Sequence, residues 1–226
     1  MRAGVPSSVS PMVMHQEKLP ALMVDVDGVL IRHPDGRRWD TDLLADLGVD
    51  PAELDAAFFR PHFDDVLTGR ADLTDRLEQV LPSIAPHVPA QDLIDYWFAH
   101  DASLDEILLA DLDRARRAGL AVYLATVQEH QRAAYLWNTV GLRRHFDGMH
   151  YAADLGFRKT DSEFYTTIER RTGFAAGQIC FIDDRAENVA MATSAGWRAF
   201  HWNPSSRLDP VLAGLQTGTG HGTAAY

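Results

Sequence analysis

Apolar runs alternate with amphipathic segments through most of the chain between residues 20 and 202. The amphipathic segments place apolar residues on one helical face, and they end at glycines that suit a helix C-terminus. Apolar runs typical of buried strands begin at Ala21 and cover Leu120–Ala125, Ile179–Asp183 and Trp197–Trp202, with a weaker one near Met149–Ala152. Such alternation predicts an α/β fold, a Rossmann-like parallel sheet with helices on both faces and right-handed crossovers.

Helix start signals are clear in the second half of the chain. Ser103-x-x-Glu106 and Thr160-x-x-Glu163 have the spacing of capping boxes, so we expect helices to begin at Ser103 and Thr160. Two more helices are expected over 129–140 and 186–195, each followed by a glycine.

The stretch 34–102 has a different pattern. It contains several helical pieces and no convincing strand, and Asp50-Pro51 is a good helix start. Further helices are expected over 72–81 and 90–100, separated by Pro82, Pro86 and Pro89. This pattern predicts a helical cap inserted into an α/β core formed by 19–33 and 103–210. Residues 1–18 and the tail 211–226, rich in Gly, Thr and Ala from Gly214 on, are expected to be disordered.

Composition and charge narrow the classes of function. The formal charge of −11 argues against a nucleic-acid partner, because affinity for phosphate backbones comes from Lys and Arg. The chain has no apolar run near 18 residues and its start lacks the pattern of a signal peptide, so we expect no membrane partner. The single cysteine, Cys180, fits a reducing compartment and a cytoplasmic location, and its apolar surroundings predict a buried structural thiol. A monomer or a homodimer is expected.

Two acids follow the first apolar run at once, in the sequence Asp25-Val26-Asp27-Gly28. Side chains at i and i+2 of a strand leave by the same face, so Asp25 and Asp27 are expected to converge at the strand end. Two adjacent carboxylates repel each other, and an oxygen-loving cation such as Mg²⁺ relieves this. Taken alone, the motif fits a strand that runs into an Asx/Gly turn equally well. An EF-hand loop fits less well, since its twelfth position is Gly36 instead of an acid.

Four features at strand ends then follow one another along the chain. They are Asp25/Asp27, Thr126 after the second strand, Lys159 before a helix, and Asp183-Asp184 after a later strand. The residue types and their order resemble the four motifs of the haloacid dehalogenase-like hydrolase superfamily over roughly residues 20–202. The segments Asp154–Lys159 and Phe181–Asn188 are especially similar to those of the subgroup with a small helical cap.

The resemblance implies a Mg²⁺-dependent phosphatase that acts on a small phosphorylated metabolite, such as a sugar phosphate. In it Asp25 would be the nucleophile that forms an aspartyl-phosphate, and Asp27 the general acid and base. Thr126, Val127 and Lys159 would contact the phosphoryl group, the first and last being counted among the catalytic residues. Asp25, Asp183, Asp184 and the backbone carbonyl of Asp27 would hold the metal. Without that context, Thr126 is an ordinary strand-terminal residue, Lys159 a surface lysine, and Asp183-Asp184 a helix cap.

Two positions depart from the family pattern. Val127 stands where Asn is common, and Thr160 stands where Pro is common. Val127 lacks the side-chain amide that Asn would place near the phosphoryl site. A catalytically weak phosphate-binding or interaction protein is therefore one alternative function. A dehalogenase of the same fold is a further alternative. It needs no metal and usually lacks the second acid of the first motif, so Asp27 and Asp183-Asp184 argue against it. In the cap, Arg60, His62 and Arg70 are candidates for contacts with the substrate.

Overall fold

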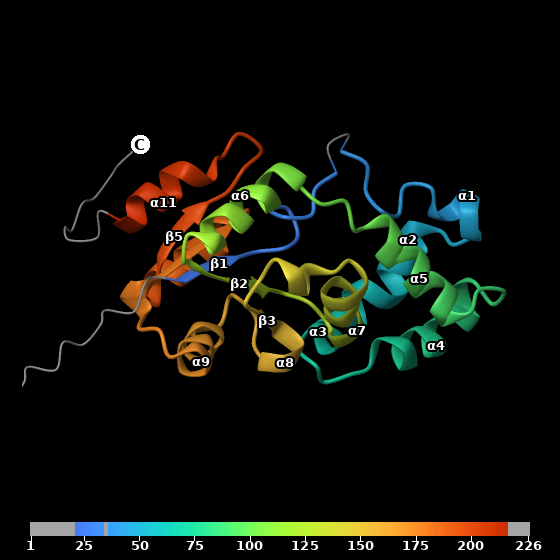
Figure 1. The fold of residues 1–226 in the computed structure, drawn as a ribbon. Coiled ribbons are helices and arrows are strands. Elements are labelled where there is room, and N and C mark those ends of the chain that lie inside the picture. The colour runs from blue at the N-terminus through green and yellow to red at the C-terminus, as the bar shows by residue number, and fades with distance from the viewer. Residues whose placement is uncertain (1–20, 34–35, 217–226) are drawn as a thin grey trace, which may run out of the picture.

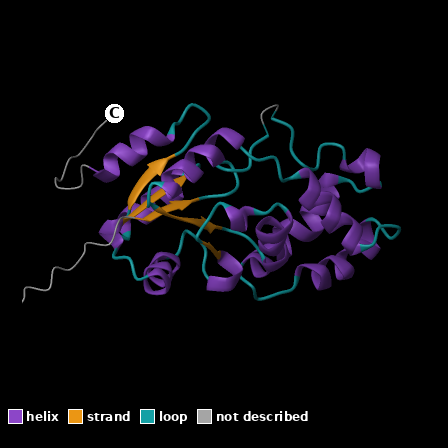
Figure 2. Ribbon diagram, viewed as in Figure 1, coloured by secondary structure: helices purple, strands orange, loops and turns teal. Residues whose placement is uncertain are grey.

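The computed structural model describes residues 21–33 and 36–216, and its centre is a five-stranded parallel sheet (Figures 1 and 2). The strand order is β3-β2-β1-β4-β5, so β1 lies in the middle. The strands are β1 (Ala21–Val24), β2 (Ala121–Thr126), β3 (Gly148–Tyr151), β4 (Ile179–Asp183) and β5 (Arg198–His201). The predicted α/β fold with a parallel sheet is therefore confirmed.

Helices cover both faces of the sheet, because side chains alternate along each strand. Leu22 and Val24 face a hydrophobic cluster that includes α6 (Glu106–Arg117) and α11 (Leu208–Gln216). Met23 faces the opposite cluster, with α9 (Ser162–Thr172) and α10 (Ala186–Ser194). Figure 1 shows α6 and α11 on one side of the strands and α9 on the other.

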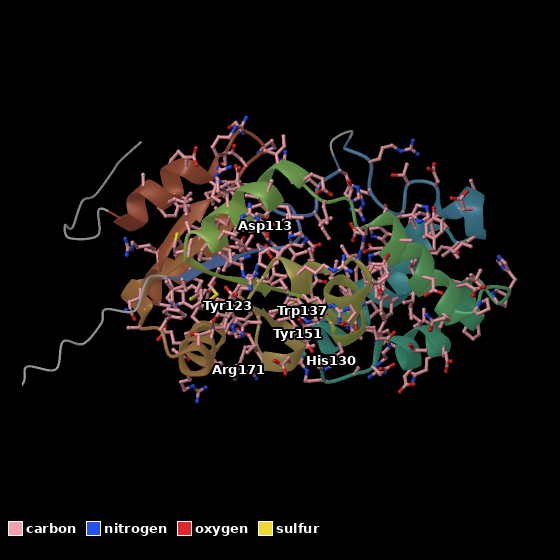
Figure 3. The ribbon with its side chains drawn as sticks, viewed as in Figure 1. Asp113, Tyr123, His130, Trp137, Tyr151 and Arg171 are labelled. Carbon is pink, nitrogen blue, oxygen red and sulfur yellow. The ribbon has the colours of Figure 1, made fainter. Side chains whose placement is uncertain are left out.

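Several shorter elements connect these strands and helices. They are α7 (His130–Ala134), a π-helical segment η2 (Tyr135–Thr139), α8 (Ala152–Leu155) and the 3₁₀ turns η3 (Leu142–Arg144) and η4 (Ala176–Gln178). Figure 3 shows His130, at the start of α7, close to Tyr151, at the end of β3. The Nδ1 atom of His130 lies 3.3 Å from the Tyr151 hydroxyl, which joins α7 to the sheet.

The inserted region forms a separate helical layer, drawn to the right of the sheet in Figure 1. Its helices are α1 (Leu43–Leu47), α2 (Pro51–Leu54), the π-helical η1 (Asp55–Phe59), α3 (Arg60–Leu67), α4 (Leu73–Ile84) and α5 (Ala90–His100). They bury a hydrophobic cluster of their own. Asp50 caps α2 by accepting a hydrogen bond from the Ala52 backbone, as its sequence predicts.

Three helix boundaries differ from the prediction. Asp105, not Ser103, caps α6 by accepting from the Leu108 backbone, and α9 begins at Ser162 after Asp161. Aspartate is as good an N-cap as serine, so the capping-box spacing at Ser103 pointed two residues too early. Asp161 makes no capping bond to α9 and accepts from the Arg158 backbone instead. Helix α4 continues through Pro82 to Ile84. Pro82 removes the hydrogen bond of its own backbone nitrogen, but Ala85 still donates to the Leu81 carbonyl at 2.8 Å.

The C-terminal prediction also needs a correction. Residues 211–216 belong to α11 instead of a disordered tail, because Leu208 and Val211 are buried in the same hydrophobic cluster as Leu22. The predicted disorder of 1–18 and 217–226 lies outside the described residues. Among the described residues no helix combines the length and the apolar character needed to cross a membrane. Cys180 is buried, and burial raises the pKa of its thiol to about 12, as expected of a structural cysteine.

Candidate active site

The two central strands bring Asp25 and Asp183 together at their carboxyl ends. Val24 pairs with Ile182, and the Asp25 backbone donates a hydrogen bond to the Ile182 carbonyl at 3.0 Å. Asp25 therefore follows β1 at the level where Asp183 closes β4. Both carboxylates are almost closed to solvent, with exposed fractions of 5% and 0%. Carboxyl ends of parallel strands are where open α/β sheets carry their chemistry.

Lys159 supplies the positive charge between these two acids. Its Nζ lies 2.6 Å from an oxygen of Asp25 and 2.7 Å from an oxygen of Asp183. The lysine comes from the connection between α8 and α9 and is 1% exposed. The hydroxyl of Tyr165 donates to the carbonyls of Lys159 and Asn188, at 2.8 and 3.1 Å. Tyr165, which the sequence patterns did not single out, thus fixes this connection against α10.

The electrostatics of this cluster follow from burial. Burial raises the pKa of Asp25 to about 8, against the opposing charge of Lys159 and with a further rise from Asp183. Burial also disfavours the charged form of Lys159, but Asp25 and Asp183 outweigh it and raise its pKa. Lys159 therefore stays charged at neutral pH, and its charge opposes the effect of burial on Asp25.

Asp184 completes a group of three acids that can hold a cation. Asp25, Asp183 and Asp184 each offer one oxygen, and these oxygens lie within 4.8 Å of one another. Burial and the neighbouring Asp183 raise the pKa of Asp184. Asn188 donates to both oxygens of Asp183, at 3.0 and 3.1 Å, and so orients that carboxylate. Three hard oxygen donors so close together match the coordination chemistry of Mg²⁺.

Gly28 makes room for the third acid. Its backbone has a φ of +78°, and a Cβ atom there would lie 2.2 Å from an Asp184 oxygen. Only glycine satisfies both conditions, since a positive φ is strained in other residues and the carboxylate occupies the space of a side chain. The glycine of the Asp25–Gly28 motif is thus explained by the approach of Asp184.

Asp27 belongs to a different network, although it lines the same cleft as Asp25. Its side chain is 53% exposed; Gln128 donates to it at 2.6 Å and Arg132 lies 3.5 Å away. Protein atoms around the cleft still desolvate the Asp27 carboxylate and raise its pKa, against the effects of Arg132 and Gln128. Arg132 is buried, and its guanidinium also lies 3.0 Å from Asp101.

Gln128, Arg132 and Asp101 were not predicted as site residues. The sequence pattern marks only Asp27 as a site residue, because Gln128 comes from the loop after β2, Arg132 from α7 and Asp101 from the end of the insert. The position of Gln128 two residues after Thr126 was the one available signal, because the carboxyl end of β2 lies beside that of β1.

Thr126 and Val127 lie at the end of β2, next to β1. Thr126 is fully buried and accepts a hydrogen bond of 3.4 Å from Gln128. Val127 lines the cleft, whereas Thr126 is not among its lining residues. A contact between the Thr126 hydroxyl and a phosphoryl group stays a prediction.

The cleft itself has a volume of about 410 Å³ and lies between the sheet and the insert. The residues from the α/β core include Asp25, Asp27, Lys159 and Asp184, and the insert contributes Phe63, Leu67, Trp97 and Asp101. Arg60, His62 and Arg70, the candidates for substrate contacts in the insert, do not line the cleft. Arg60 pairs with Asp55, and Arg70 pairs with Asp64 and Asp65, since local acids attract them to exposed surfaces.

Comparison with known proteins places this site in a family. A family model described as a haloacid dehalogenase-like hydrolase matches residues 19–196. The chain belongs to the haloacid dehalogenase-like hydrolases. The match includes Asp25, Thr126, Lys159 and Asp183, the residues at the four strand ends.

Similar proteins include one curated enzyme and several solved structures. A sesquiterpene phosphatase of Aspergillus oryzae is 31% identical over 93 residues, which are 38% of this hydrolase and 44% of that enzyme. A family enzyme of Bacteroides thetaiotaomicron, solved as a magnesium complex, has a TM-score of 0.72 at 16% identity over 87% of this hydrolase and 99% of its own chain. A hydrolase of Porphyromonas gingivalis, described as predicted and HAD-like, has a TM-score of 0.70 at 18% identity, over 88% and 98% of the two chains. These structures show that the fold is shared.

Proposed function

We propose that this hydrolase is a Mg²⁺-dependent phosphatase that acts through an aspartyl-phosphate on Asp25. The observation that carries the proposal is the buried cluster of Asp25, Lys159 and Asp183, with Asp184 beside it. A phosphomonoester is a dianion, so an anionic nucleophile reacts with it only where nearby positive charge offsets the repulsion. Lys159 supplies part of that charge.

The proposed reaction has two steps. An Asp25 oxygen attacks phosphorus, the bond from phosphorus to the alcohol oxygen breaks, and Asp27 donates its proton to the leaving oxygen. Water then attacks the phosphorus of the aspartyl-phosphate and gives a proton to Asp27. The bond from phosphorus to the Asp25 oxygen breaks, so phosphate is released and Asp25 is restored. The partial desolvation that raises the pKa of Asp27 favours its protonated form, which is the form that a general acid needs.

Asp25, Asp183 and Asp184 would hold the metal, together with the backbone carbonyl of Asp27. When bound, Mg²⁺ would neutralise these carboxylates, favour the anionic form of Asp25 and orient the phosphoryl oxygens. The solved relatives from Bacteroides thetaiotaomicron, which include a complex with magnesium and inorganic phosphate, support this assignment. Thr126, Val127 and Lys159 would contact the phosphoryl group.

Residues 34–102 would act as a cap over the reaction. Both connections of this insert run close to Asp27: His33 lies 2.9 Å from Asp101, and Asp101 contacts Arg132. Closing lids exclude water from reacting phosphates, which is the role proposed here.

A simple assay tests the function. Purified protein is incubated with p-nitrophenyl phosphate, with Mg²⁺ or with EDTA, and released nitrophenol is measured. We expect turnover with Mg²⁺ and a loss of several orders of magnitude with EDTA. Turnover unaffected by EDTA, or none under either condition, would refute the proposal.

A further inference from the structure

The cap contributes mainly apolar side chains to the cleft. Phe63 and Leu67 come from successive turns of α3, and Trp97 comes from α5. Residues four apart on a helix share one face, so Phe63 and Leu67 form a continuous apolar strip. The strip lines the same cleft as Asp25, Asp27, Asp184 and Lys159 of the α/β core.

Other aromatic rings hold this strip in place. The ring of Phe63 lies 5.0 Å from that of Phe59 and 5.6 Å from that of Trp97, in edge and tilted contacts. Trp97 stacks on Trp39 at 5.3 Å. Such packed rings are a preformed apolar wall and are poorly suited to repack around a polar ligand.

The cap offers almost nothing that recognises hydroxyl groups. Among the described residues of the insert, Asp101 is the one charged side chain that lines the cleft. Its carboxylate already contacts Arg132 at 3.0 Å, His33 at 2.9 Å and the indole nitrogen of Trp97 at 3.3 Å. A sugar or polyol hydroxyl placed against Phe63 or Leu67 would therefore be buried without a partner from the cap, which is unfavourable.

We infer that the substrate is a phosphomonoester of an apolar alcohol, with a hydrocarbon or aryl group packed against Phe63, Leu67 and Trp97. This inference rests on the proposed phosphatase function and names its substrate class. The phosphoryl group lies at the polar end of the cleft, near Asp25 and Lys159, and the apolar group extends toward the cap. Sugar phosphates, which the sequence suggested as substrates, are expected to be poor ones.

The test is a chain-length series. Straight-chain alkyl phosphates from butyl to octyl are compared with glycerol 3-phosphate and glucose 6-phosphate, with Mg²⁺, and kcat/KM for phosphate release is measured. Burial of each methylene in the cleft is expected to raise kcat/KM by about two- to fourfold until the apolar wall is covered. The two polyol phosphates are expected to fall below butyl phosphate.

Variants locate the effect. Leu67→Asn keeps the size of the side chain but makes the wall polar, so kcat/KM is expected to depend much less on chain length. The matched control is Leu44→Asn on α1, where the side chain is 57% exposed and away from the cleft, and it is expected to keep the full dependence. Inhibition of the wild-type protein by alkylphosphonates of the same lengths gives a second reading that needs no variant.

The outcomes separate the inference from the proposed function. Hydrolysis of p-nitrophenyl phosphate with no rise along the alkyl series, or with glucose 6-phosphate as the better substrate, would overturn the inference and leave the phosphatase proposal standing. A dependence on chain length that Leu67→Asn leaves intact would also overturn it, as would alkylphosphonate inhibition that does not change with length. No hydrolysis of any phosphate ester would refute both.

Discussion

The ammonium group of Lys159 lies 2.6 Å from an oxygen of Asp25, and both side chains are nearly closed to solvent. Lys159 also neutralises Asp183, so one cation serves two buried carboxylates. A buried charge that loses its partner is strongly destabilising, because the desolvation cost remains and the attraction is lost. The stability of the site and its proposed chemistry therefore depend on the same lysine.

Replacement of this lysine is expected to destabilise the protein. Lys159→Met leaves Asp25 and Asp183 without a cation, and we expect the free energy of unfolding to fall by about 3–5 kcal/mol. Mg²⁺ should restore part of this loss, because it binds the same acids. Urea unfolding with and without Mg²⁺ measures both effects. The control is Arg171→Met, which breaks an exposed pair with Asp154 and should cost about 1 kcal/mol or less, independent of Mg²⁺. Equal losses in the two variants would contradict the account.

Two glycine substitutions test whether Asp184 needs the free space beside Gly28. Gly28→Ala and Gly36→Ala each place a Cβ on a backbone with positive φ, which costs roughly 1–2 kcal/mol. A Cβ at Gly36 meets nothing within 4 Å, whereas a Cβ at Gly28 overlaps the Asp184 carboxylate. Gly28→Ala is therefore expected to weaken Mg²⁺ binding, seen as a smaller rise of Tm with added Mg²⁺. An unchanged rise in Gly28→Ala would show that Asp184 does not require this space.

The buried imidazole of His150 on β3 is expected to make the protein less stable as the pH falls. Burial lowers its pKa from 6.5 to about 4, so the native state keeps it neutral while the unfolded chain takes up a proton. The stabilising contribution is complete above pH 6.5 and is lost as the pH falls toward 4. The loss between pH 7 and pH 5 is about 2 kcal/mol. Between pH 7 and pH 5 we expect the free energy of unfolding of the wild-type protein to fall by this amount more than that of His150→Gln. Urea unfolding at the two pH values measures the difference. Parallel losses would rule out a neutral buried imidazole.

Loss of the Asp27 carboxylate is expected to slow the hydrolysis of some substrates more than that of others. Asp27→Asn removes the proton donor but keeps an oxygen that accepts from Gln128. Turnover of alkyl phosphates should drop by about 10²–10⁴-fold, and that of p-nitrophenyl phosphate by much less, because a good leaving group needs little protonation. The ratio of the two kcat values in variant and wild type measures this. Equal drops on both substrates would contradict a general-acid role.

The strands and the acids at their ends follow directly from the sequence. Ile179–Asp183 was predicted without error, because a continuous apolar run that ends in two acids allows few other interpretations. The cluster of Asp25, Asp183 and Asp184 follows from parallel pairing, which brings all carboxyl ends to one edge of the sheet.

Contacts between side chains on separate elements could not be predicted from the sequence. Arg132 reaches both Asp27 and Asp101, yet each residue alone has the pattern of an ordinary polar side chain. The apolar face that α3 turns toward the cleft also depends on how the insert packs. The short π-helical stretch that precedes α3, and the place of Pro61 in that helix, where it cannot donate to the Ala57 carbonyl, were not predicted from the sequence either.

The central claim is that Asp25 is the nucleophile, and Asp25→Asn tests it most directly. The asparagine keeps the shape of the site and removes the anion that attacks phosphorus. Wild-type and variant protein are mixed with substrate and Mg²⁺, quenched in acid and analysed by peptide mass spectrometry, and released phosphate is measured in parallel. The account predicts a phosphoryl group on the Asp25 peptide of the wild type, no adduct in the variant, and phosphate release lower by several orders of magnitude. Normal turnover by Asp25→Asn, or a phosphoryl group on another residue, would contradict it.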